Sequence, residues 1–168
     1  MLPVLIGLLF VPGAAAAWAA LFLYILSSVT DFFDGWLARK YEVVSGFGTF
    51  LDPISDKVFV AALLVALTAI DRLDGVWILP TLIILAREFL VSGMREFLGP
   101  KNIKLPVSAA AKWKTTLQMI ALGFLVIGPY GDIIIPHTTL IGQITLSVAA
   151  ILTIWTGWIY LRTGARYF

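Results

Sequence analysis

Apolar segments long enough to cross a membrane follow one another along nearly the whole chain. Charged residues and turn residues divide the chain into six blocks, at residues 1–11, 14–41, 48–70, 76–98, 106–128 and 136–160. The last five blocks each reach the ~20 residues that a membrane-spanning helix requires. With 60% hydrophobic residues and a mean hydropathy of +0.96, the sequence predicts an all-α polytopic membrane protein. We expect six transmembrane helices in a single domain, residues 1–168.

The first block is shorter than the other five. Residues 1–11 fall well below the length of a spanning helix. We therefore expect the first transmembrane helix to be truncated, with further residues of the protein preceding Met1.

Basic residues gather on one side of the predicted membrane. The connections after the second, fourth and sixth blocks carry Arg39, Lys40, Lys101, Lys104, Arg162 and Arg166, whereas those after the first, third and fifth carry Arg72 alone. The positive-inside rule therefore places the first group and both termini in the cytoplasm. A net charge of +2 gives no field for nucleic-acid binding. Because the chain has no cysteine, disulfides and thiolate metal sites are excluded.

Two pairs of aspartates flank the connection between the second and third blocks. Asp31 and Asp34 stand near the end of one predicted helix, and Asp52 and Asp56 stand where the next one opens. Residues three or four apart share a helix face. A short connection makes the two helices antiparallel neighbours, so the two pairs can face each other.

The cost of these carboxylates predicts a metal site. An aspartate at mid-membrane costs roughly 2.5–3.5 kcal/mol on insertion scales, and four clustered negative charges would also repel one another. Hard divalent cations remove both penalties, and carboxylate oxygens are their preferred ligands. The alternative is that the aspartates cap helix ends, with Asp52 as an N-cap before Pro53. That alternative leaves Asp31 and Asp34 unexplained, because the C-terminal end of a helix disfavours anions.

The neighbours of the aspartates suit a phosphate-bearing ligand. Gly35 and Ala38 leave space for a ligand to approach the backbone, and Arg39 is close enough to meet an anion at the metal. We expect Gly46 and Gly48 to break the connection before the third block. His137, in a predicted outer turn, is expected to be a loop residue rather than a metal ligand.

Basic residues in the fourth and fifth blocks predict a second anion site. Arg87 and Arg95 are eight residues apart, about 80° around a helix, so both can face one pocket. A guanidinium binds phosphate with two parallel hydrogen bonds. Lys112 and Lys114 open the fifth block on the same side. Two alternatives stay open: Arg87 pairs with Glu88 or another acid, and the two lysines are interfacial anchors.

The fixed residues carry a family resemblance. The segment reads D-x2-D-G-x2-A-R-x8-G-x3-D-x3-D, given by Asp31, Asp34, Gly35, Ala38, Arg39, Gly48, Asp52 and Asp56. It resembles the signature of the CDP-alcohol phosphotransferase family at every fixed position and spacing. Residues 86–89 with Arg95, and then residues 112–119, resemble the bacterial phosphatidylglycerophosphate synthases of that family. The resemblance covers nearly the whole chain.

The resemblance implies six transmembrane helices, a homodimer and a two-metal active site, with Mg²⁺ or Mn²⁺, open to the cytoplasm. A bacterial inner membrane is its implied location. In that family an alcohol displaces CMP from a CDP-linked lipid or alcohol. The usual Asn-Pro…Leu-Thr…Arg segment before and within the first helix does not appear in this sequence. We therefore expect the nucleotide site to be incomplete as given.

Carried over by position, the signature assigns roles. The metal ligands would be Asp31, Asp34, Asp52 and Asp56, with Asp56 also the candidate base. The CDP portion would contact Gly35, Ala38, Arg39 and Gly48. With CDP-diacylglycerol as donor, the phosphate of sn-glycerol 3-phosphate would be received by Arg87, Arg95, Lys112 and Lys114.

Two rival functions remain at this stage. The first keeps the family and changes the acceptor to inositol phosphate, phosphatidylglycerol, serine or choline; the basic residues favour a phosphorylated acceptor over serine and choline. The second is a divalent-cation transporter that uses the aspartates as a midplane site. The sequence disfavours it, because no interrupted helix pair recurs in corresponding halves.

Overall fold

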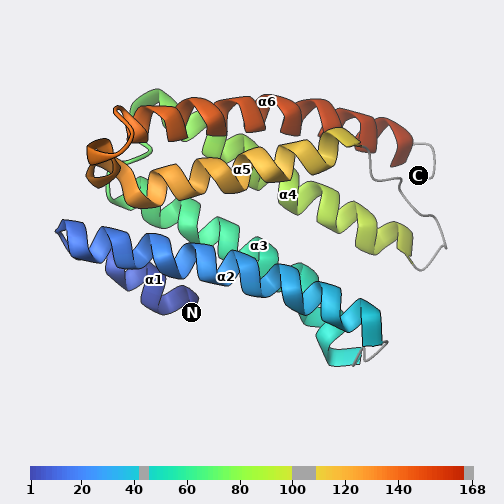
Figure 1. Cartoon of the computed structure of the whole chain (residues 1–168). Helices are drawn as coiled ribbons and strands as arrows, with labels where there is room; N and C mark the ends of the chain where they lie inside the picture. The colour runs from blue at the N-terminus through green and yellow to red at the C-terminus, as the bar shows by residue number, and fades with distance from the viewer. Residues whose placement is uncertain (42–45, 100–108, 165–168) are drawn as a thin grey trace.

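The protein is a bundle of long helices (Figure 1). A computed structural model describes the backbone of residues 1–41, 46–99 and 109–164, and omits within these the side chains of residues 31, 32, 34–41, 46–53, 56, 109–111, 163 and 164. The helices are α1 (Leu2–Leu9), α2 (Ala14–Tyr41), α3 (Gly46–Ala69), α4 (Ile78–Leu98), α5 (Ala109–Ile127) and α6 (Thr138–Gly164), with 3-10 segments η1 (Gly75–Trp77) and η3 (Gly128–Ile133). The described ranges contain no strand, so the all-α prediction is confirmed.

Three stretches are long and apolar enough to cross a membrane, judged by length and composition within the described residues. They are Gly75–Leu98, Lys112–Ile133 and Thr138–Arg162. Shorter apolar stretches run over Ala14–Thr30 and Lys57–Ala69. Large apolar side chains also cover the exterior; Phe22, Ile151 and Trp158, for example, are each about two-thirds exposed. Such a surface is typical of a protein that faces lipid, and the chain is an integral membrane protein.

The start of α3 differs from the prediction. The helix begins at Gly46, so Gly46 and Gly48 belong to its first turn rather than to a break. Asp52 is consequently an interior helix residue and not an N-cap, and Pro53 follows it inside the helix. The N-cap alternative is wrong because it treated Pro53 as a first-turn residue, whereas membrane helices accommodate a proline in their interior.

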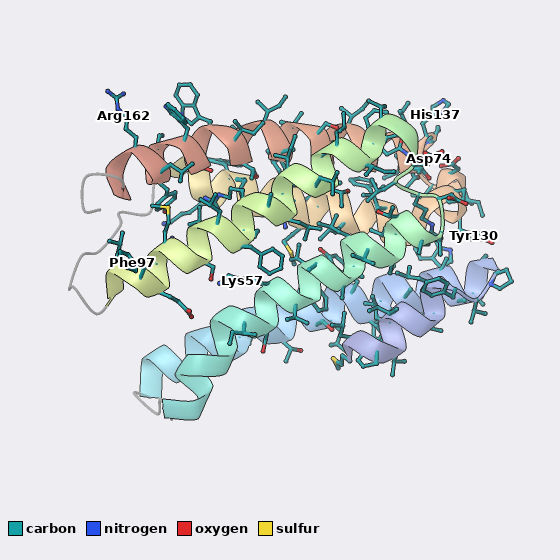
Figure 2. All side chains as sticks on the ribbon, turned by 180° about the vertical axis from the view of Figure 1, so that it is seen from behind. Lys57, Asp74, Phe97, Tyr130, His137 and Arg162 are labelled. Carbon is teal, nitrogen blue, oxygen red and sulfur yellow. The ribbon has the colours of Figure 1, made fainter. Side chains whose placement is uncertain are left out.

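The bundle divides into two halves along its length. One end carries the turns at residues 10–13, 70–77 and 128–137, and we call the half that contains it the turn half. Figure 2 places Asp74, Tyr130 and His137 at that end, and Phe97 and Arg162 at the opposite end. We call the opposite half the polar half, because it contains the ends of α2 and α4 and the starts of α3 and α5, with the predicted site residues.

The turn half contains an apolar core. Leucines from α3 and α5 meet there with Ile84 of α4 and Leu146 of α6, all fully buried. The main helix pairs of the bundle are α5 with α6 and α4 with α6, and α2 packs on α5. Tyr24 joins the last pair, since its hydroxyl donates to the carbonyl oxygen of Met119 at 2.8 Å.

Arg72 closes the turn half. Its Nη1 donates to the carbonyl oxygens of Leu125, at 2.7 Å, and of Val126. These carbonyls end α5 and lack helical partners, so the guanidinium caps the helix where a cation is also favoured by the dipole. Burial lowers the pKa of Arg72, but a guanidinium starts so high that it keeps its charge. The one basic residue predicted outside thus has a structural role.

Candidate active site

The two aspartate pairs lie on helices that run side by side. Asp31 and Asp34 belong to α2, and Asp52 and Asp56 to α3. Both figures show the end of α2 and the start of α3 adjacent and antiparallel in the polar half. Neither pair sits at a helix end, because α2 continues to Tyr41 and α3 begins at Gly46. The end-capping alternative is therefore wrong for all four residues.

The side chains of the signature residues lie outside the described ones. This applies to Asp31, Asp34, Gly35, Ala38, Arg39, Gly48, Asp52 and Asp56, whose backbones are helical. Among the side chains that are described, no three His, Asp or Glu residues are grouped to hold a metal. The metal and nucleotide assignments therefore stay predictions. Their donor set, four carboxylates on two adjacent helices, is of the type that Mg²⁺ and Mn²⁺ prefer.

A largely buried ion cluster joins α4 to α5. Glu88 Oε1 accepts a hydrogen bond from Nζ of Lys114, and Nη1 of Arg87 lies 3.2 Å from the same oxygen. The side chains of Lys114 and Arg87 are only 5% and 13% exposed. Arg87 thus has the acidic partner that one alternative expected. Lys114 is buried against a carboxylate, so interfacial anchoring is wrong for it.

A tyrosine of α6 contacts two arginines of α4. The guanidinium carbons of Arg87 and Arg95 lie 5.5 Å and 5.4 Å from the ring centre of Tyr160. Nη2 of Arg95 also donates to the Tyr160 hydroxyl at 3.2 Å. Both arginines thus lie on the same side of α4, as their spacing predicted, and the distances are within the ~6 Å range of a cation–π contact. That they line one pocket stays a prediction.

One turn before Tyr160, α6 holds Arg87 a second time. Nη2 of Arg87 donates to Oγ1 of Thr156 at 3.3 Å. Gly157 follows, and a Cβ placed there would come within 3.1 Å of the Arg87 side chain. The arginine stem therefore lies directly on the backbone of α6. Its Nε is buried with no hydrogen-bond partner among the described residues.

Sequence reasoning missed Tyr160 and Thr156. Both are buried polar side chains four residues apart in an apolar span, and residues at that spacing share a helix face. This periodicity was the available signal. Sequence reasoning also missed a hydrogen bond that joins α3 to α4. Nζ of Lys57, the residue after Asp56, donates to Oγ of Ser92.

Lys112 and the outer-turn residues lie apart from this cluster. Lys112 is exposed on α5, two residues from buried Lys114, and residues at that spacing face different directions. His137 and Asp71 are exposed turn residues with positive φ. Asp132 accepts a hydrogen bond from the backbone N–H of Thr138 at 2.8 Å and so caps α6. The loop assignment of His137 is confirmed.

An apolar cavity of about 430 Å³ opens between α2 and α5. Its lining on α2 ends at Ser28 and Val29, just before Asp31, and it extends toward η3 and the start of α6. The cavity thus runs from the neighbourhood of the aspartates into the turn half.

Comparison with known proteins reveals a family match and close relatives. The model of the CDP-alcohol phosphatidyltransferase family matches residues 1–155. A Rickettsia bellii protein named CDP-diacylglycerol–glycerol-3-phosphate 3-phosphatidyltransferase is 46% identical over 167 residues, 99% of this chain and 90% of its own length. Proteins of the same name are similar in Cereibacter sphaeroides, at 52% over 113 residues (67% of this chain, 51% of the relative), and Haemophilus influenzae, at 36% over 167 residues (98% and 86%).

Proposed function

Since the chain belongs to the CDP-alcohol phosphatidyltransferase family, a family of transferases, we propose that it moves the phosphatidyl group of CDP-diacylglycerol onto sn-glycerol 3-phosphate. The products would be phosphatidylglycerol phosphate and CMP. The relatives that match nearly the whole chain carry the name of this reaction, which supports the choice of both substrates.

The observation that supports a phosphorylated acceptor is the excess of positive charge on α4 and α5. Three cations, Arg87, Arg95 and Lys114, lie close together in the polar half. Among the described side chains, the carboxylate that pairs with Arg87 and Lys114 is Glu88. Burying cations in an apolar bundle is costly unless anions compensate them. A phosphate of the acceptor would supply that compensation, in competition with Glu88, and the forked guanidiniums suit it.

The aspartates would provide the metal site. Asp31, Asp34, Asp52 and Asp56 would hold two divalent cations, Mg²⁺ or Mn²⁺, which when bound neutralise the diphosphate and favour attack at phosphorus. Gly35, Ala38, Arg39 and Gly48 would face the CDP portion. The apolar cavity that reaches Ser28 and Val29 of α2 is suited to the acyl chains of the donor.

The chemistry follows from these positions. Asp56 would take the proton of the acceptor 1-hydroxyl while the hydroxyl oxygen attacks the lipid-side phosphorus. The bond from that phosphorus to the CMP oxygen breaks, and Arg39 would stabilise the charge on the leaving CMP. The basic cluster would hold the acceptor phosphate, so catalysis would depend mostly on positioning and electrostatic stabilisation.

We place this reaction at the cytoplasmic side of a bacterial inner membrane. In this proposal the helices make six spans, and the protein is a homodimer. The distribution of basic residues supports the orientation, because Arg39, Lys40 and Arg162 belong to the polar half and Arg72 to the turn half.

The test is CMP release by the purified protein from CDP-diacylglycerol with a panel of acceptors, with and without Mg²⁺ or Mn²⁺. Release should require the metal and should be fastest with sn-glycerol 3-phosphate. Equal or faster release with inositol phosphate or serine would contradict the acceptor. Metal flux into vesicles without CMP release would contradict the reaction and favour a cation transporter.

A further inference from the structure

Tyr160 contacts two charged residues that bind the acceptor phosphate in the proposed function. It is almost fully buried, at 3% exposure, and lies on α6, whereas both arginines lie on α4. Its ring faces the guanidiniums of Arg87 and Arg95 at nearly equal distances, 5.5 Å and 5.4 Å. One side chain of α6 therefore contacts two side chains of α4.

The two arginines need such a partner. They carry like charges, and long side chains lose rotamer freedom when they are held in place. An aromatic face attracts a guanidinium without neutralising it. Glu88 pairs with Arg87 and Lys114, and the Tyr160 hydroxyl accepts from Arg95. Tyr160 thus contacts both arginines without neutralising their charge, and the carboxylate of Glu88 is what a phosphate would compete with at Arg87.

Gly157 and Thr156 extend this arrangement by one turn. Thr156 accepts a hydrogen bond from Arg87 Nη2, and the missing side chain of Gly157 lets the Arg87 stem lie on α6. The Arg87 side chain is thereby held at its stem by the backbone, at its end by Thr156, and on its face by Tyr160. These contacts fix the position of the largely buried Arg87 side chain from three directions.

We propose that Tyr160 is a positioning residue for the acceptor phosphate: its ring sets Arg87 and Arg95 in the arrangement that receives the phosphate. The inference rests on the proposed function and adds a residue to it. Gly157 is the second part of the same device. It does not touch the donor in this assignment, so its substitution should alter the acceptor KM and leave the donor KM unchanged.

Three variants of the full chain test this, with KM measured separately for sn-glycerol 3-phosphate and CDP-diacylglycerol. Tyr160→Leu removes the ring and should raise the acceptor KM roughly tenfold, the size expected from losing two partly desolvated cation–π contacts. Tyr160→Phe keeps the ring and should stay within about threefold of wild type, since it loses one neutral acceptor. Trp158→Leu is the matched control, because Trp158 is 66% exposed on the same helix, and it should change neither KM.

If Tyr160→Leu does not fold, Gly157→Ala still tests the inference. Its new Cβ would meet the Arg87 side chain at 3.1 Å, so the acceptor KM should rise about threefold to tenfold while the donor KM stays constant, a size typical of small displacements at a binding site. The inference is overturned if folded Tyr160→Leu or Gly157→Ala protein leaves the acceptor KM unchanged, or raises both KM values equally. A wild-type protein that releases no CMP with this acceptor overturns the proposed function itself, and the inference with it.

Discussion

The turn half and the polar half of the bundle are built from the same helices and differ in what they bury. In the turn half, leucines of α3 and α5 form an apolar core, and Arg72 caps α5. In the polar half, α4, α5 and α6 bring Arg87, Glu88 and Lys114 together. Apolar burial stabilises a fold without directional demands, whereas a buried ion cluster stabilises only when every partner is present. We infer that the turn half mainly provides stability and the polar half provides chemistry.

The largest effect should come from the polar half. Asp56→Ala removes the proposed base and metal ligand, and CMP release should fall below detection. The helix itself should persist, because alanine favours helices. Size-exclusion chromatography and thermal unfolding in detergent would confirm that the variant inserts and folds. Full turnover by a folded Asp56→Ala protein would contradict the assignment of this residue.

Glu88→Gln should destabilise the polar half. Arg87 and Lys114 would lose their shared carboxylate, and the cost should be about 2–3 kcal/mol, at or below the ~3–5 kcal/mol of a fully buried pair because Glu88 keeps 22% exposure. Thermal unfolding measures the loss. A double variant, Glu88→Gln with Lys114→Met, should recover part of it, since the unpaired ammonium is then absent. No recovery would indicate that Lys114 is not the residue left uncompensated.

Gly128→Ala should weaken the turn half alone. Gly128 has φ +55°, and a Cβ there would come within 2.7 Å of the Arg72 guanidinium. The left-handed backbone and the displaced cap together should cost about 2 kcal/mol, seen as a lower Tm. Gly7→Ala is the control, because it adds a Cβ in open space within α1. A change in either substrate KM at a temperature where the variant is folded would contradict the division between the halves.

Arg87→Lys should produce the smallest effect, and one confined to binding. The charge remains, but an ammonium cannot reproduce the forked contacts to Thr156, Glu88 and an incoming phosphate. The acceptor KM should rise roughly tenfold, or ~1.4 kcal/mol, with the donor KM unchanged. An equal rise in both KM values would assign Arg87 to the shape of the bundle rather than to the acceptor.

The same two halves differ in how far the sequence predicted them. Turn residues and charges located most helices to within a few residues, and the bounds of α2 are as predicted, because Pro12-Gly13 stops one helix and starts the next. The third block was predicted to start at residue 48, close to the observed start of α3 at Gly46. Only the N-cap alternative for Asp52 failed, since Pro53 is a first-turn signal that a membrane helix also tolerates in its interior.

The polar cluster was predicted in part. Helix geometry alone put Arg87 and Arg95 on one face, and their shared contact with Tyr160 agrees. It could not decide between anchoring and burial for Lys114, because that depends on where α4 places Glu88. Tyr160 and Thr156 were missed because their spacing marks a shared helix face but does not show that this face packs on α4, which is a tertiary property. The roles of the aspartate side chains stay predictions.

The most direct test of the proposed reaction follows the acceptor into the lipid product. Purified protein would be given radiolabelled sn-glycerol 3-phosphate, CDP-diacylglycerol and Mg²⁺ or Mn²⁺, and the label would be measured in the organic phase together with CMP in the aqueous phase. We predict label in the lipid in equal amount to CMP, and neither product when the metal is chelated. CMP release without labelled lipid, or no turnover under any of these conditions, would contradict it.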